Sequence, residues 1–229
     1  MPGAATTARA LQLRVGADPE RFVRRPGRAL VLGAGFLVLF ALGAILVPVA
    51  PIAIERGWAG WMHDVETPVL THVALVFNFL GRGTGRILVL GALALVLLAA
   101  RRWEALLAFA LAEAVTPFAS ALVKALVDRP RPPDGLVHPA GASFPSGHAA
   151  FAGATCVAAV LLFTRAGPGR ARWWTLALAG TAVMAWSRTY LQVHWLLDVV
   201  AGSLLGAGVS LAAFAAVQLV WPARKVVES

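Results

Sequence analysis

The chain has 229 residues, of which 59% are hydrophobic and only 14% are charged, with a net charge of +9 and a mean hydropathy of +0.75. Soluble domains carry about 25% charged residues, so this composition excludes an ordinary soluble protein and places most of the chain in lipid. In so apolar a chain, the positive charge indicates cytosolic loops and lipid headgroups as its partners and not nucleic acid. A single cysteine, Cys156, excludes an internal disulfide.

Six apolar stretches are long enough to cross a bilayer, which takes about 20 residues per helix. In chain order these predicted spans are 29–50, 81–100, 103–127, 147–164, 173–190 and 194–220. The apolar run 69–80 is too short to cross, so we expect an interfacial or re-entrant helix before the second span. The predicted fold is therefore all-α, an integral membrane bundle of six transmembrane helices within one domain, 29–221. A disordered basic cytosolic tail, 1–28, precedes this domain, and a short cytosolic tail, 222–229, follows it.

The basic and aromatic residues orient this bundle. If the N-terminus is cytosolic, 13 of the lysine and arginine residues fall in cytosolic segments and 7 in outer ones, as the positive-inside rule requires. Four tryptophans, Trp58, Trp61, Trp186 and Trp195, then lie at the outer interface, and the other four lie at the inner one. The usage of alanine, arginine and glycine is typical of a high-GC bacterium. We therefore expect a multi-pass protein of a bacterial cell membrane, with both termini cytoplasmic.

Three polar motifs meet at the outer face of this topology. They are KALVDRPRP (124–132), PSGH (145–148) and SRTYLQVHWLLD (187–198). Charged groups at membrane depth are costly and usually functional. The cations Lys124, Arg131 and Arg188 converge there with two histidines, which indicates an anion of more than one negative charge. A phosphate monoester or a diphosphate, bound on the extracytoplasmic side, fits this description.

Each residue type in the motifs suits phosphoryl transfer, in which catalysis is mainly positioning and electrostatic stabilisation. Ser146 and Gly147 begin the fourth span, where free N–H groups and the helix dipole favour an anion. His194 and Asp198 are four residues apart, which on one helix places them on the same face. The carboxylate can then hold one imidazole nitrogen and leave the other free to attack. His148 is the natural acid for the departing oxygen.

Together, Lys124-x6-Arg131-Pro132, Pro145-Ser146-Gly147-His148 and Ser187-Arg188-x5-His194-x3-Asp198 resemble the signature of the type 2 phosphatidic acid phosphatase (PAP2) superfamily. The resemblance covers about residues 80–210 and includes the six-span layout of the membrane branch. It implies phosphate binding by Lys124, Arg131, Ser146, Gly147 and Arg188. It further implies that His194 is the nucleophile that forms a phosphohistidine, with Asp198 as its orienting partner and His148 as the general acid. It implies neither a metal nor another cofactor, and no obligate protein partner is evident.

Several functions remain open on the sequence. The leading one is a lipid phosphate phosphatase, a monoester or diphosphate hydrolase. Recycling of undecaprenyl or decaprenyl diphosphate suits its outward-facing site best. Phosphatidylglycerophosphate or phosphatidate is the rival substrate. A lipid phosphotransferase could use the same phosphohistidine, and a binding or transport protein could use the same cations without hydrolysis, although it would need neither histidine.

Some of these residues also have plain structural interpretations. Ser146 taken alone could be only a helix cap, and cations at helix ends often reach for headgroups. The segment GRGTG (81–85) resembles a phosphate loop, but we expect it only to start a helix. His138 is expected in a loop. Glu113 stands in the middle of a span, where we expect a buried hydrogen bond and not a proton relay.

Overall fold

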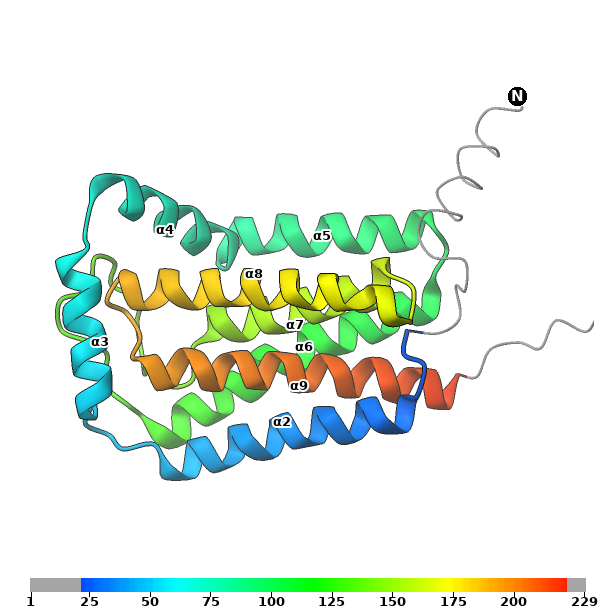
Figure 1. Ribbon diagram of the computed structural model, residues 1–229, viewed down its shortest axis with the longest axis horizontal. Helices are drawn as coiled ribbons and strands as arrows, with labels where there is room; N and C mark the ends of the chain where they lie inside the picture. Colours follow the sequence, from blue (N-terminus) through cyan, green and yellow to red (C-terminus); the bar gives the residue numbers. More distant parts are fainter. Residues whose placement is uncertain (1–21, 222–229) are drawn as a thin grey trace, which may run out of the picture.

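The computed structural model describes residues 22–221, and within this range the fold is entirely helical. The helices are α2 (Pro26–Leu46), α3 (Ala53–Asp64), α4 (Pro68–Leu80), α5 (Gly83–Ala99), α6 (Trp103–Val127), α7 (Gly147–Phe163), α8 (Ala171–Tyr190) and α9 (Leu196–Val220), with a short 3-10 turn, η1 (Pro168–Arg170). The long helices run along one axis, and α3 crosses their end on the side where α8 meets α9 (Figure 1). The molecule is thus a helix bundle with a cap at one end.

Three helices are long and apolar enough to cross a membrane, namely α2, α6 and α9. The pair α4 and α5 would make a fourth span, but it is bent by 61° at its break. The described part of the chain therefore supplies three to four spans by length and composition, which makes it a multi-pass membrane protein. Helix α7 is apolar but has only 17 residues.

The predicted spans all coincide with helices, and their ends differ from the predicted ones by at most four residues. The run 69–80 is indeed a separate helix, α4, and the segment 81–85 starts α5, as expected. Helix α3 was not anticipated, because its twelve residues mix charged, aromatic and small side chains and give no apolar run. The last span is shorter than predicted: α9 begins at Leu196, after its cap Trp195, so His194 lies in the preceding turn.

The last part of the predicted N-terminal tail is folded. The first part of that tail lies outside the described residues, as does the predicted tail 222–229. Phe22 and Val23 are buried, and the two backbone polar groups of Val23 bond to the side-chain amide of Gln218 on α9, at 3.1 and 3.0 Å. Phe22 also packs edge-to-face on Phe214. Residues 22–28 therefore belong to the folded bundle, and assigning them to the tail was wrong.

Glycines allow α9 to lie directly against α7. A Cβ on Gly202 would collide with the carbonyl oxygen of Ser146, and one on Gly206 with that of Ala150. Small residues four apart let helix backbones meet in membranes, where lipid is as apolar as the side chains. The contact brings the N-termini of both helices together, so that the N–H of Ser146 donates to the carbonyl oxygen of Asp198 at 2.9 Å. Two of the three motifs meet at this point.

Candidate active site

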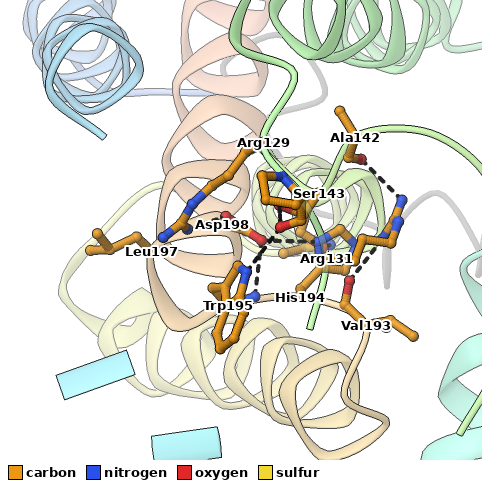
Figure 2. A network of polar contacts seen from close by, with 12 residues as sticks. Arg129, Arg131, Ala142, Ser143, Val193, His194, Trp195, Leu197 and Asp198 are labelled. Atoms are coloured by element: carbon orange, nitrogen blue, oxygen red, sulfur yellow. Dashed lines mark hydrogen bonds and ion pairs between the residues drawn. The ribbon is translucent and has the colours of Figure 1, made fainter. Parts of the chain in front are cut away.

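Asp198 is the centre of the network in Figure 2 and is fully buried. Its Oδ1 accepts a hydrogen bond from Arg129 Nη1 at 2.7 Å, and its Oδ2 accepts one from the backbone N–H of Trp195 at 2.9 Å. The same Oδ2 lies 3.5 Å from Nδ1 of His194. The carboxylate therefore faces one ring nitrogen of His194 and leaves Nε2 to the rest of the site.

The turn between α8 and α9 brings His194 to Asp198. Because His194 precedes α9, the two residues do not share a helical face, and the expected reason for their proximity was wrong. The turn folds back instead, with the N–H of Val193 bonded to the carbonyl oxygen of Arg188 at 3.2 Å. His194 is only 5% exposed. Burial lowers the pKa of His194 to about 4, although Asp198 favours its protonation, so the ring is neutral at pH 7 and has a lone pair available for attack.

Arg129 holds Asp198 in place from the loop after α6. Its buried guanidinium donates to both carboxylate oxygens of Glu55, at 3.0 and 2.6 Å, as well as to Asp198. Glu55 belongs to α3 and also accepts from the N–H of Leu197 at 3.1 Å, next to Asp198. All three side chains are fully buried. A charge buried in this way is tolerated only when it is paired and hydrogen-bonded, so the three residues form one structural unit.

Lys124 and Arg131 both converge on the loop that leads to α7. Lys124 Nζ donates to the carbonyl oxygens of Ala142 and Ser143, at 2.8 and 3.2 Å. Arg131 donates to the carbonyl oxygens of Ala142 and Val193, at 3.0 and 2.7 Å, and its Nη1 lies 3.3 Å from His194 Nε2. The two cations thus share the carbonyl oxygen of Ala142, and Arg131 also reaches Nε2 of His194 (Figure 2).

Helix α7 begins at the site with the Pro-Ser-Gly-His segment. Ser146 is a buried N-cap whose Oγ accepts from the N–H of Ala149 at 3.5 Å, so it does cap the helix. The first N–H groups of a helix have no partner inside it and attract anions. His148 Nε2 lies 3.2 Å from the backbone oxygen of Asn78. A carbonyl oxygen only accepts, so Nε2 carries the proton and donates it to this bond, and in the neutral ring Nδ1 carries the lone pair.

Arg188 reaches the site from the last turn of α8. It is 1% exposed, and its Nη1 donates to Oδ1 of Asn78 at 2.8 Å, while its Nε has no hydrogen-bond partner among the described residues. Asn78 therefore contacts both Arg188 and His148 from α4. A cavity of about 260 Å³ lies beside His148 and is also lined by Lys124 and Gly147, among others.

The structure brings all eight predicted site residues to one end of the bundle, and it adds three that sequence reasoning missed. Arg129 lies within the segment 124–132 but was given no role there, although its Arg-Pro pair directly precedes the Arg131-Pro132 pair. Asn78 is the single asparagine of the chain and interrupts an apolar run, which was an available signal. Glu55 gave no signal, because it lies in no motif. Of the other residues considered, His138 is exposed, and Glu113 is buried and accepts a hydrogen bond from Thr155 at 2.8 Å, as expected.

Fold and site define an all-helical membrane protein with a histidine–carboxylate pair beside clustered cations. The chain belongs to the PAP2 superfamily, whose family description matches residues 103–222, more than half of the sequence. The six predicted spans and the three motifs indicate the same family from the sequence alone.

Several known proteins are similar to this chain. An undecaprenyl-diphosphatase of Sulfolobus acidocaldarius is 40% identical over 73 residues, a stretch that is 31% of this chain and 32% of that relative. A transmembrane PAP2-type phosphatidylglycerolphosphate phosphatase from Bacillus subtilis has a similar fold, with a TM-score of 0.62 at 22% identity, covering 79% of this chain and 93% of that one. LpxE of Aquifex aeolicus gives a TM-score of 0.59 at 21% identity, covering 71% and 95%.

Replacing Arg129 should damage both stability and catalysis. Arg129→Met leaves the carboxylates of Asp198 and Glu55 buried without their cation, which costs about 3–5 kcal/mol for a buried pair. We expect a clear fall of the unfolding temperature in detergent and a loss of phosphate release. Glu55→Gln keeps the bond between Arg129 and Asp198 and should slow turnover much less. Arg28→Met, at an exposed position on α2, is the matched control. Wild-type rates in Arg129→Met would contradict the role of Arg129.

Proposed function

We propose that this protein is a membrane phosphatase that hydrolyses a lipid phosphate through a phosphohistidine, without a metal. The observation that carries the proposal is the placement of His194, with Nδ1 facing Asp198 and Nε2 3.3 Å from a guanidinium nitrogen of Arg131. A nucleophile needs both arrangements: a carboxylate to orient the ring and stabilise its positive charge, and cations to hold the phosphate that it attacks.

The residues take the following roles in this proposal. Neutral His194 attacks the phosphorus with Nε2, while Lys124, Arg131 and Arg188 stabilise the charge on the equatorial oxygens. The N–H groups at the start of α7, next to Ser146 and Gly147, bind the same oxygens. His148, which must carry a second proton on Nδ1 to act as an acid, delivers that proton to the leaving oxygen. Water then attacks the phosphorus and gives a proton back to His148, which breaks the bond to His194 and releases phosphate.

A polyprenyl diphosphate such as undecaprenyl diphosphate is the substrate we propose first. The support is the undecaprenyl-diphosphatase activity of the Sulfolobus relative, together with the outward-facing site that the charge distribution favours. Phosphatidylglycerophosphate is the second candidate, supported by the fold of the Bacillus subtilis phosphatase. Both substrates place a phosphate at the end of a lipid, so the same site chemistry serves either one.

The proposed topology has six spans, α2 and α5 to α9, with both termini in the cytoplasm of a bacterial cell. In this arrangement α3, which crosses the end of the bundle where α8 turns into α9, lies on the extracytoplasmic side (Figure 1). The support is the excess of arginine and lysine in the sequence segments that this topology assigns to the cytoplasm, 13 against 7. Trp58 and Trp61 of α3, whose ring centres lie 5.1 Å apart, would then belong to the outer aromatic belt.

Phosphate release by the purified protein tests this function. In detergent with excess EDTA, we expect release from undecaprenyl diphosphate to exceed release from phosphatidylglycerophosphate and phosphatidate. His194→Ala should abolish both turnover and a phosphoenzyme that is labile in acid, because no other group replaces the nucleophile. Loss of activity in EDTA that zinc or magnesium restores would overturn the metal-independent mechanism. Consumption of the lipid substrate only when an alcohol acceptor is added, with the phosphate recovered on that alcohol, would instead identify a phosphotransferase.

The role of His148 can be separated from that of His194 by the leaving group. His148→Ala removes a general acid, which is typically worth about 10²- to 10⁴-fold. The loss should be large for a lipid monophosphate, whose alkoxide needs a proton, and small for an aryl phosphate, whose phenolate does not. Single-turnover rates on the two substrates measure this difference. Equal losses on both would mean that His148 is not the acid.

Thiol labelling in intact cells tests the orientation. In a Cys156→Ala background, Asp134→Cys places an exposed thiol in the loop before α7, and Gly169→Cys places one at the opposite end of that helix. An impermeant maleimide should label the first variant and not the second. Both variants should react after the cells are permeabilised, which controls for access. The reverse pattern would move the site to the cytoplasmic side.

A further inference from the structure

One cation in the cavity beside the site belongs to none of the three motifs. The cavity of about 260 Å³ that Lys124 and His148 line is also lined by Arg86, from the first turn of α5. The side chain of Arg86 is 25% exposed, so most of it is buried. A charge on an apolar helix is costly unless it serves a purpose, and the cavity places this one beside the proposed general acid.

Neighbouring side chains hold Arg86 in position. Its Cζ lies 5.0 Å from the ring centre of Phe151, and Nη2 lies 3.6 Å from Oε2 of Glu113. The other oxygen of Glu113 accepts a hydrogen bond from Thr155 at 2.8 Å, which fixes the carboxylate. A guanidinium has five N–H donors. One ion pair at 3.6 Å leaves most of them available to a ligand in the cavity.

The arginine lies deeper in the bundle than the proposed phosphate site. Along α7, Phe151 and Thr155 follow His148 by three and seven residues, or about 4.5 and 10 Å at 1.5 Å per residue. Along α6, Glu113 precedes Lys124 by eleven residues, or about 16 Å. The contacts of Arg86 are therefore with residues on the side of the site that faces the middle of the bundle.

We propose that Arg86 binds the lipid-linked phosphate of a diphosphate substrate, an inference that rests on the proposed function and specifies its substrate class. The terminal phosphate of such a substrate lies at His194, and its lipid chain must point toward the membrane interior. The second phosphate then lies between the terminal phosphate and the lipid chain, which places it beside His148 and at the deeper level of Arg86. A lipid monophosphate has no group to place there.

Arg86 acts on the leaving group in this reaction. His194 Nε2 forms a bond to the terminal phosphorus, and the bond from that phosphorus to the bridging oxygen breaks. The electron pair stays on the bridging oxygen, which leaves as part of a polyprenyl phosphate and takes a proton from His148. Arg86 stabilises the negative charge that increases on this leaving phosphate. With a monophosphate the leaving group is an alcohol, and Arg86 has no charge to stabilise.

Two substrates of equal chain length test the inference, farnesyl diphosphate and farnesyl monophosphate. Loss of one hydrogen-bonded charge contact lowers kcat/KM by about 10- to 100-fold, so Arg86→Gln should show this loss on the diphosphate and less than about threefold on the monophosphate. Arg86→Lys keeps the charge and should restore most of the activity. Arg101→Gln is the matched control, because Arg101 is exposed just beyond the opposite end of the same helix.

Glu113→Gln separates ligand binding from a structural ion pair. This variant breaks the pair but keeps the charge of Arg86, so it should retain the preference for the diphosphate. If Arg86→Gln slows both substrates equally, or if Glu113→Gln loses the preference to the same extent as Arg86→Gln, the inference is overturned. A wild-type protein that releases phosphate from farnesyl monophosphate but not from the diphosphate would overturn the proposed diphosphate specificity itself.

Discussion

The buried ion network of Glu55, Arg129 and Asp198 is the interaction on which the geometry of the site depends. It joins three separate parts of the chain: α3, the loop after α6 and the start of α9. Burying a charge costs several kcal/mol unless its partners are well placed, so each of the three positions constrains the other two. Asp198 connects this network to two other parts of the site. Its side chain faces the ring of His194, and its carbonyl oxygen binds the N–H of Ser146.

Apolar length and motif spacing made much of the fold predictable from the sequence. A run of about 20 apolar residues has few alternatives to a helix in lipid, and α6 has the same ends as predicted, 103–127. Apolar length does not reveal a helix that is stabilised by packing and not by lipid, and α3 is such a helix. It also could not place His194 outside α9, because the start of that helix depends on the bond between Asp198 and the N–H of Trp195.

The missed site residues have a common physical reason. Arg129 meets Glu55 across 74 residues and Asp198 across 69, and Arg188 meets Asn78 across 110. No local spacing reports such contacts, since they are made only when the helices pack. The motif residues could be predicted because their chemical types are unusual in an apolar chain. Asn78 and Glu55 act by holding those residues in place, and a lone amide or carboxylate outside a motif does not indicate which partner it holds.

The balance of charge explains why these supporting residues matter to an anion site. Arg129 is paired with two carboxylates, and Arg86 is paired with Glu113. Lys124, Arg131 and Arg188 instead bond to backbone oxygens and to an amide, which carry no net charge. Five cations therefore face three carboxylates, which leaves two positive charges uncompensated. This excess equals the charge of a phosphate dianion. The excess positive charge belongs to the three cations without carboxylate partners. It therefore attracts the phosphate to the side of the network where His194 Nε2 lies. Asp198 keeps its negative charge and can stabilise the imidazolium that forms when His194 attacks.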